Sequence, residues 1–310
     1  MAQADNTLAG LIQMNNMNNA DIDVTDLLQS APWLKEAYAT EASNGTLHSY
    51  LKETLAAGVA FRDPNTGIAN VAGQETEVSV ALKLMDASLV RDKGIAMKYS
   101  KGGIPAYMAK QGMKSIKSAF KNAEKQLING TDNDATGNNG LADTLDAIGG
   151  FCYSNGGAVA NSQTSVYFLF EGEDDVAVIA GNDGVLDIGD VVEQRVSTNS
   201  TGTEGYTGLT QSILGWLGLQ VGSIHSCARL ANVDAVAPLT DDKIAGVLAG
   251  FPADKRPTRI LMNSASQEQL RSSRTATSPS GAPAPVVEQA FNIPITVTDS
   301  IVSTEAVVTA

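Results

Sequence analysis

The feature that most constrains this chain is one long amphipathic helix, expected from about Ile104 to Ile128. Pro105 suits its first turn, and Asn129-Gly130 supplies a stop signal. Residues three or four apart form an apolar stripe along the helix, which needs a surface to pack against. The stripe consists of Met108, Gly112, Ile116, Ala119, Phe120, Ala123 and Leu127.

The face away from this stripe carries lysines at spacings of four, three, four and four residues. At 100° per residue they fall within about 80° of one another. They are Lys110, Lys114, Lys117, Lys121 and Lys125. One interpretation is a solvated helix face. The other is a basic surface set against an acidic neighbouring subunit or a polyanion, which makes these lysines candidate inter-subunit or inner-surface residues.

Charge is strongly segregated along the chain. The 310 residues carry a net charge of −13, yet residues 97–128 hold seven Lys and one Glu, a net of +6 that leaves −19 elsewhere. Residues 129–193 contain twelve Asp or Glu and no Lys or Arg. A chain this acidic is a poor candidate for a protein that binds duplex DNA, because phosphate contacts come from clustered Lys and Arg.

The N-terminal segment, residues 1–24, is rich in Asn, Asp and Met. It reads either as an arm that needs a partner surface or as a frayed terminus. A short helix capped by Thr25 follows, and Pro32 and Trp33 are expected to interrupt it. No basic n-region, apolar h-region or run of about 18 apolar residues is found, so neither a signal peptide nor a membrane span is expected, and the default compartment is a reducing cytoplasm.

Residues 47–97 predict two long strands with a connection that contains Pro64, Gly67 and Gly73. Their apolar residues are too few for a hairpin to stand alone in water, so the pair needs another surface, which a second copy of the protein could provide. Residues 165–234 are mostly strand by pattern. Helices are expected at 241–251 and 264–274, and strands at 259–263 and 291–301. This order shows no βαβ alternation, which favours an α+β fold over a doubly wound sheet.

A search for chemistry finds no site above background. Residues 132–143 partly resemble a calcium loop, with Asp132, Asp134 and Asp143 as weak ligand candidates. Asn139 stands where an apolar residue is usual and no matching helix pair is evident, so a polar turn-forming loop is the favoured interpretation. We therefore expect no catalytic, cofactor or metal site, and no enzymatic activity.

Other residue types give little more. His225 is expected to be half-buried in a strand, with Cys227 on the same face, and Glu171–Asp175 reads as a solvated turn. Only His48 and His225, and only Cys152 and Cys227, are available for chemistry that needs these residues. A hairpin with little core, one amphipathic helix, an arm and split charge are features of a protein that completes itself by assembling.

Several segments, in this order, resemble the major capsid proteins of tailed double-stranded DNA bacteriophages with the HK97-type fold. Residues 23–69 resemble the N-terminal arm and the extended hairpin loop, with Phe61-Arg62 and Asn65-x-Gly67 in the rising strand. The lysine-rich helix and residues 123–143 resemble the spine helix and its Asn/Gly-rich turn. Residues 164–234, then 256–273 and 291–301, resemble a β-rich stretch, a strand–helix segment and a strand with a buried Pro.

The resemblance implies a shell-forming subunit whose hexamers and pentamers tile an icosahedral head around double-stranded DNA, without sequence-specific binding. Its hairpin would lie over a neighbouring subunit, with Arg62 and Asn65 as candidate contact residues, and its arm would clasp another. Implied partners are further copies of the chain and, beyond these, scaffold, portal and decoration proteins, but no membrane. The place is the virion capsid, assembled in the host cytoplasm. No cross-link is expected, because Lys52 and Lys83 flank the hairpin while its tip, residues 64–73, has no Lys.

The implied organisation has five parts. They are an N-terminal arm at 1–47, an extended hairpin loop at 48–97, a spine helix of a peripheral domain at 98–130, a β-rich peripheral or axial region at 131–235 and an axial domain at 236–310. One departure from the family's order is that the strand-rich segment precedes residues 259–263. Two alternatives stay open, an encapsulin-like compartment shell and a calcium-dependent binding module; a carboxylate hydrolase is the weakest alternative.

Overall fold

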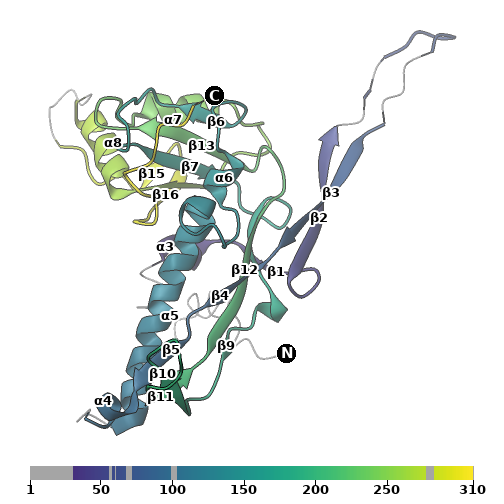
Figure 1. Ribbon diagram of the computed structural model, residues 1–310. Coiled ribbons are helices and arrows are strands. Elements are labelled where there is room, and N and C mark those ends of the chain that lie inside the picture. Colours follow the sequence, from purple (N-terminus) through teal and green to yellow (C-terminus); the bar gives the residue numbers. More distant parts are fainter. Residues whose placement is uncertain are drawn as a thin grey trace.

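The computed structural model describes residues 31–55, 58–59, 61–67, 72–98, 103–276 and 283–309. The predicted arm at residues 1–24 and the helix capped by Thr25 lie outside these residues. Three features dominate the shape: a sheet with two helices at one end, a long helix below it, and a hairpin that projects away from both (Figure 1). Helices and sheets are mixed without regular alternation, as an α+β fold requires.

The long helix is α5, Gly103–Asn129, which confirms the predicted element. Met108, Phe120 and Leu127 on its apolar stripe are almost fully buried. The helix ends at Gly130, which has φ +59° and begins the 3-10 turn η2, Gly130–Asp132. A Cβ on Gly130 would lie 2.4 Å from the backbone nitrogen of Gly140, so both the conformation and the space require glycine.

Beside α5 lie two of the sheets. The first contains, in order, β1 (Ala39–Glu41), β8 (Val176–Ala180), β12 (Ile213–Val221) and β4 (Lys83–Asp86), with β9 (Asp187–Ile188) also on β12. The second is β10 (Val192–Ser197), β11 (Gly205–Gln211) and β5 (Leu89–Asp92). Short helix α4, Lys93–Met97, joins β5 toward α5 and is capped by Asp92, whose carboxylate accepts the N–H of Gly94 at 2.7 Å.

The third sheet is six-stranded and draws strands from both sides of residue 235. Its order is β15 (Gln289–Ala290), β16 (Ile293–Val297), β14 (Arg259–Met262), β7 (Thr164–Leu169), β13 (Cys227–Val233) and β6 (Cys152–Ser154). Helices α7, Asp241–Leu248, and α8, Ser264–Ala276, lie at this end of the molecule (Figure 1). Short helix α6, Leu141–Thr144, lies between this sheet and α5.

One expectation about connectivity was wrong. Strands β14 and β16 are parallel, with Ile260 opposite Ile295, and α8 forms the crossover between them. The chain therefore contains one βαβ unit, although no such alternation was expected. The fold class is unaffected, because β7, at the centre of this sheet, pairs antiparallel with both β14 and β13.

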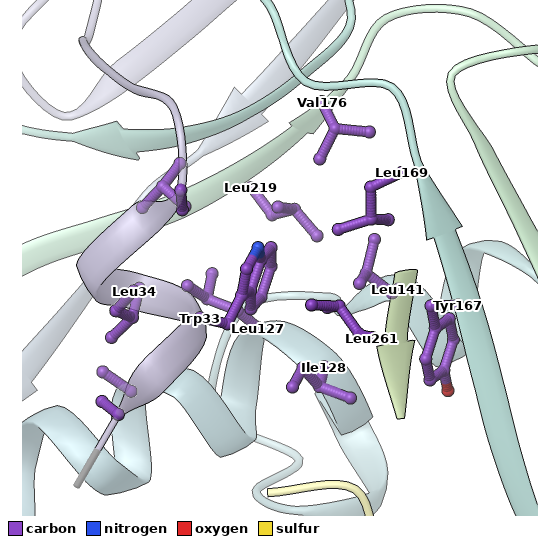
Figure 2. Close-up of a cluster of buried hydrophobic side chains, with 14 of the residues drawn as sticks. Trp33, Leu34, Leu127, Ile128, Leu141, Tyr167, Leu169, Val176, Leu219 and Leu261 are labelled. Atoms are coloured by element: carbon purple, nitrogen blue, oxygen red, sulfur yellow. The ribbon is translucent and has the colours of Figure 1, made fainter. Parts of the chain in front are cut away.

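Strand β7 separates two hydrophobic cores. Its residues are all buried, and their side chains alternate between faces. Tyr167 and Leu169 face a core made with α3 and α5, whereas Val166 and Phe168 face a core made with α7 and α8. Figure 2 shows the first of these cores, in which the indole of Trp33 lies among Leu127, Leu219 and Leu261.

Helix α3, Pro32–Glu36, begins at the proline. Pro32 suits this position, because a first-turn residue needs no N–H partner and its fixed φ suits the helix. Whether Pro32 also ends an earlier helix stays a prediction, because the residues before it lie outside the described part of the chain. Trp33 is fully buried and anchors the helix in the core. Ala31 at the N-cap offers no side-chain acceptor. The N–H groups in the first turn, which have no partner within the helix, are therefore bonded to another part of the chain.

The predicted strand pair is present as β2, Leu47–Leu55, and β3, Gln74–Ala81, which pair antiparallel with Tyr50 opposite Val78. The second strand is shorter than its alternation indicated. After Ala81 the chain buries Leu82 and continues into β4 and β5, which join the two other sheets. The alternating apolar pattern correctly predicted strands in this part of the sequence. It did not show that the chain passes from one sheet to another after Ala81, because strands with one exposed face give the same pattern in either sheet.

Candidate assembly surfaces and their anchors

The hairpin β2–β3 presents apolar side chains to solvent. Leu51 is 68% exposed, Val59 is 92% exposed and Phe61 is fully exposed. These residues lie on an element that projects from the body and has no core of its own (Figure 1). Exposed apolar residues on an extended element without a core make the hairpin a candidate assembly surface.

The tip of the hairpin is a tight turn at residues 63–66. The N–H of Thr66 donates to the carbonyl of Asp63 at 3.2 Å, Pro64 occupies the second position, and Asn65 takes a φ of +68°. These are the requirements of a type II turn. Arg62 Nη1 donates to the carbonyl of Thr66 at 3.1 Å. Arg62 and Asn65 thus shape the tip locally, and their contact with a neighbouring subunit stays a prediction.

The root of the hairpin is attached to strand β12. His48 Nε2 lies 2.6 Å from Gln220 Oε1, and the hydroxyl of Tyr50 donates to the carbonyl of Val221 at 3.1 Å. Burial raises the pKa of Tyr50, so its hydroxyl stays protonated and available as a donor. These side-chain bonds fix the angle at which the hairpin leaves the body.

The lysine stripe lies on α5, on the other side of the body from the hairpin tip (Figure 1). Lys110, Lys114 and Lys121 are exposed, whereas Lys117 and Lys125 are partly covered. Lys125 lines a polar cavity of about 630 Å³ beside the C-terminal segment. Within one subunit, therefore, the structure does not bring the lysines together with Arg62 and Asn65.

Glu124 is a buried carboxylate that sequence reasoning missed. One oxygen, Oε2, accepts the backbone N–H groups of Trp33 at 2.8 Å and Leu34 at 3.1 Å. The other, Oε1, accepts the hydroxyls of Thr298 and Ser300. Desolvation raises the pKa of Glu124 despite these four bonds, which each favour the charged form.

The sequence carried only a weak signal for Glu124. At 100° per residue Glu124 lies between Phe120 and Lys117, at the border of the apolar stripe and the lysine face. A carboxylate that becomes buried at this border requires donors. Here the donors are the N-terminus of α3 and the segment after β16, so Glu124 joins three separate parts of the chain.

A second anchor joins α3 to the six-stranded sheet. Glu171 Oε1 accepts the indole N–H of Trp33 at 3.0 Å, and its Oε2 accepts Arg259 Nε at 3.0 Å. Arg259 also pairs with Glu36 at the end of α3. Glu171 is thus largely buried and structural, and the expectation of a solvated turn at Glu171–Asp175 was wrong at both ends.

The other end of that turn is Asp175, which is buried. Its Oδ1 accepts the hydroxyl of Ser226 at 2.6 Å and Lys255 Nζ at 2.9 Å. His225, on the adjoining turn, lies outside the strand in which it was expected, because β13 begins only at Cys227. Its ring meets Phe151 edge-on at 4.8 Å, a packing contact.

The C-terminal segment, residues 301–309, is fastened to the six-stranded sheet. Glu305 Oε2 pairs with Arg229 Nη2 at 2.9 Å and accepts the hydroxyl of Ser165. Burial raises the pKa of Glu305 even beside that guanidinium. Asn232 exchanges side-chain hydrogen bonds with the backbone N–H and carbonyl of Val308. The segment is therefore part of the folded body.

The calcium-loop candidates serve as turn caps. Asp134 Oδ1 accepts the N–H of Thr136 at 2.9 Å, and Asp143 Oδ2 accepts the N–H groups of Thr131 and Gly140, both at 2.9 Å. Asp132 lies on the exposed side of the 3-10 turn. Across the described part of the chain, no three His, Cys, Asp or Glu side chains gather closely enough to hold a metal ion. None of the described helices combines the length and apolar character needed to cross a membrane.

Comparisons with known proteins agree with this geometry. A chain from the cryo-EM structure of bacteriophage Epsilon15 superposes with a TM-score of 0.68 at 17% identity, over 89% of this chain and 88% of that one. The capsid of bacteriophage JBD30 decorated with minor capsid protein trimers gives 0.51 at 11% identity, over 86% and 90%. A search of curated proteins finds no match.

At these identities the superpositions establish the fold, which is the HK97-like capsid fold, α+β, that the sequence led us to expect. Family membership rests on sequence: the profile described as Major capsid protein GP7 matches residues 16–309. The chain therefore belongs to the major capsid protein GP7 family, and it is a structural shell protein of a tailed bacteriophage.

Proposed function

We propose that this protein assembles into pentamers and hexamers that close an icosahedral head around double-stranded DNA. The observation that carries the proposal is the hairpin β2–β3, which exposes Leu51, Val59 and Phe61 and has no core beneath it. An isolated two-stranded hairpin is marginally stable in water. Seated on a neighbouring subunit, its apolar side chains would be buried and its length would extend the interface.

The parts of the chain would divide the work of assembly. The arm at 1–47 clasps a neighbouring subunit. The loop at 48–97, with β2 and β3 as its two-stranded portion, lies over a neighbouring subunit. Helix α5, within 98–130, is the spine of the peripheral domain. Residues 131–235 contribute to the peripheral and axial regions. The axial domain, 236–310, is completed by β6, β7 and β13, since these strands belong to the same six-stranded sheet.

The lysine stripe on α5 would face the interior of the shell or dock a scaffold protein. Lys114 and Lys121 are exposed on this helix, whereas residues 129–193, which follow it, hold twelve Asp or Glu and no Lys or Arg. The net charge of −13 repels packaged DNA as a whole, so the shell would enclose the genome without binding particular sequences. Partners would be further copies of the chain, together with scaffold, portal and decoration proteins, in the host cytoplasm, and no catalytic step is involved.

Neither alternative gains an observation of its own. The three carboxylates weighed for calcium include two that already accept backbone N–H groups as turn caps. An encapsulin from Synechococcus elongatus superposes at a TM-score of only 0.45, too low to bear on the choice. The family match therefore leaves the viral shell as the proposed assembly.

Electron microscopy beside sedimentation velocity tests the proposal. The wild-type chain, with scaffold where needed, is expected to form closed shells or capsomer rings. Phe61→Ser should remain a folded subunit with an unchanged melting temperature, because the ring makes no contact that stabilises the fold, yet it should lose assembly. Phe61→Tyr keeps the aromatic surface and serves as the control. Full assembly of Phe61→Ser would remove the hairpin from the interface.

A further inference from the structure

The ring of His48 connects the root of the hairpin to two separate parts of the body. Its Nδ1 accepts the backbone N–H of Ser43 at 3.2 Å, in the turn between β1 and β2. Its Nε2 lies 2.6 Å from Gln220 Oε1 on β12. Both ring nitrogens are therefore engaged where the hairpin leaves the body.

The hydrogen-bond donors fix the state of this ring. A backbone N–H can only donate, so Nδ1 must be unprotonated to accept it. Gln220 is almost fully buried, and its Nε2 donates to the carbonyl of Glu173 at 2.7 Å, which leaves Oε1 as the acceptor that faces His48. The ring is thus the neutral tautomer with its proton on Nε2.

Ser43 links the ring of His48 to the backbone of the hairpin. Its Oγ accepts the N–H of Ser49, the residue directly after His48, at 2.9 Å. The same turn is closed by paired backbone bonds between Asn44 and Leu47, and the carbonyl of Thr46 accepts the N–H of Leu82 at the end of β3. Ser43 therefore lies at the point where β1, β2 and β3 meet.

We propose that protonation of His48 opens this turn and makes the hairpin root a proton-sensitive hinge. A proton from water added to Nδ1 replaces an acceptor by a donor, so the ring and the N–H of Ser43 oppose each other. The Nε2 bond to Gln220 survives, which leaves the hairpin tethered to β12 while the bond between the ring and Ser43 is lost. The effect of this hinge on assembly rests on the proposed role of the hairpin. The hinge itself rests only on the contacts of His48 and Ser43.

Among the described residues, His48 has no ion-pair partner for the added charge. The titratable residues on the elements around the ring are Glu41 of β1, Tyr50, Lys52 and Glu53 of β2, Glu75 and Glu77 of β3, and Glu173 and Asp174 before β8. Tyr50 lies 6.0 Å away, ring to ring, and is neutral. Within the described residues no ion pair joins His48 to a carboxylate. Histidine is the side chain type whose charge ordinarily changes between pH 5 and 8, which makes this the range to test.

Hydrogen–deuterium exchange of the full-length subunit tests the hinge directly. After correction for intrinsic rates, peptides containing the Ser43 and Ser49 amides should exchange about tenfold faster at pH 5.5 than at pH 8, as expected for the loss of one such bond. His48→Asn keeps an acceptor oxygen near the Nδ1 position and cannot titrate, so its exchange should not depend on pH. His225→Asn, the only other histidine, controls for general effects of pH and should behave as wild type.

Two outcomes would overturn the hinge: wild-type exchange that is the same at both pH values, or a pH response that persists in His48→Asn. Sedimentation of assembled shells over the same pH range is a separate measurement. A pH-dependent exchange with pH-independent shells would support the hinge while counting against the hairpin as the assembly element. The two proposals can therefore fail independently.

Discussion

The carboxylate of Glu124 accepts the backbone N–H of Trp33 at 2.8 Å across 91 residues of chain. Helix α3 lacks a side-chain cap of its own, and Glu124 supplies that cap from the C-terminal part of α5. The same carboxylate receives Thr298 and Ser300. One buried side chain thus holds the first described helix, the spine helix and the segment after the last strand together.

Replacement of Glu124 by Ala should destabilise the subunit more than replacement by Gln, which removes the charge but keeps hydrogen-bonding groups. Glu124→Ala leaves two backbone N–H groups and two hydroxyls without their buried acceptor and is expected to cost about 2–4 kcal/mol. Glu124→Gln can turn its oxygen toward Trp33 and Leu34 and its amide toward the two hydroxyl oxygens, and should cost less. Urea unfolding of both variants gives the comparison; equal losses would show that charge, not hydrogen bonding, matters at this position.

The carboxylate of Glu124 should also contribute to the pH dependence of the unfolding free energy. Its native pKa is raised above the unfolded value by desolvation, so the native state binds a proton more tightly than the unfolded chain. Stability therefore falls as the pH rises from about 4.5 through the raised native pKa, and is constant above it. Glu305 acts in the same direction.

The difference in unfolding free energy between wild type and Glu124→Gln, measured at closely spaced pH values, isolates the contribution of Glu124. Asp234 acts in the opposite direction, because its hydrogen bonds lower its pKa to about 2, so its stabilisation is lost only as the pH falls below about 4. The two windows do not overlap. A wild-type minus variant difference that does not decrease above pH 4.5 would contradict the assignment.

Two glycine-to-alanine changes should have opposite effects. Gly130 has φ +59°, and a Cβ there would lie 1.7 Å from Asp143 Oδ2 and 2.4 Å from the nitrogen of Gly140, so Gly130→Ala should destabilise by more than about 2 kcal/mol. Gly246 lies inside α7 with open space around it, so Gly246→Ala should stabilise by about 0.5–1 kcal/mol. Calorimetry of both variants checks the pair, and a loss of stability in Gly246→Ala would show that its surface has another role.

The turn between β15 and β16 holds a phenylalanine in an unfavourable conformation. Phe291 has φ +52° and Asn292 has φ +63° in a two-residue connection between Ala290 and Ile293. Asn is preferred over Phe at such positions, so Phe291→Asn should raise the unfolding free energy by about 1 kcal/mol. Phe291→Ala removes the ring but keeps a strained Cβ, and its smaller gain distinguishes backbone strain from exposure of the ring.

How far the sequence could predict this structure depends on how far apart the interacting residues lie. Residues 104–128 contain the whole signal for α5, because the apolar stripe and the stop at Gly130 lie within one stretch. The turn at residues 63–66 is equally local, with Pro64 and Asn65 in the positions that a type II turn requires. The order of segments was enough to indicate the capsid fold.

Contacts between residues or strands that are distant in sequence could be identified only from the tertiary structure. The cap on α3 comes from Glu124, the parallel pairing of β14 with β16 creates an unexpected βαβ unit, and Glu171 is buried because Trp33 and Arg259 reach it. The sequence by itself determined the elements and their amphipathic faces, since periodicity and turn chemistry act over a few residues. Only the folded chain decided which faces meet and which carboxylates are buried, because those depend on competition among surfaces more than 200 residues apart, as between Glu36 and Arg259, which are 223 residues apart.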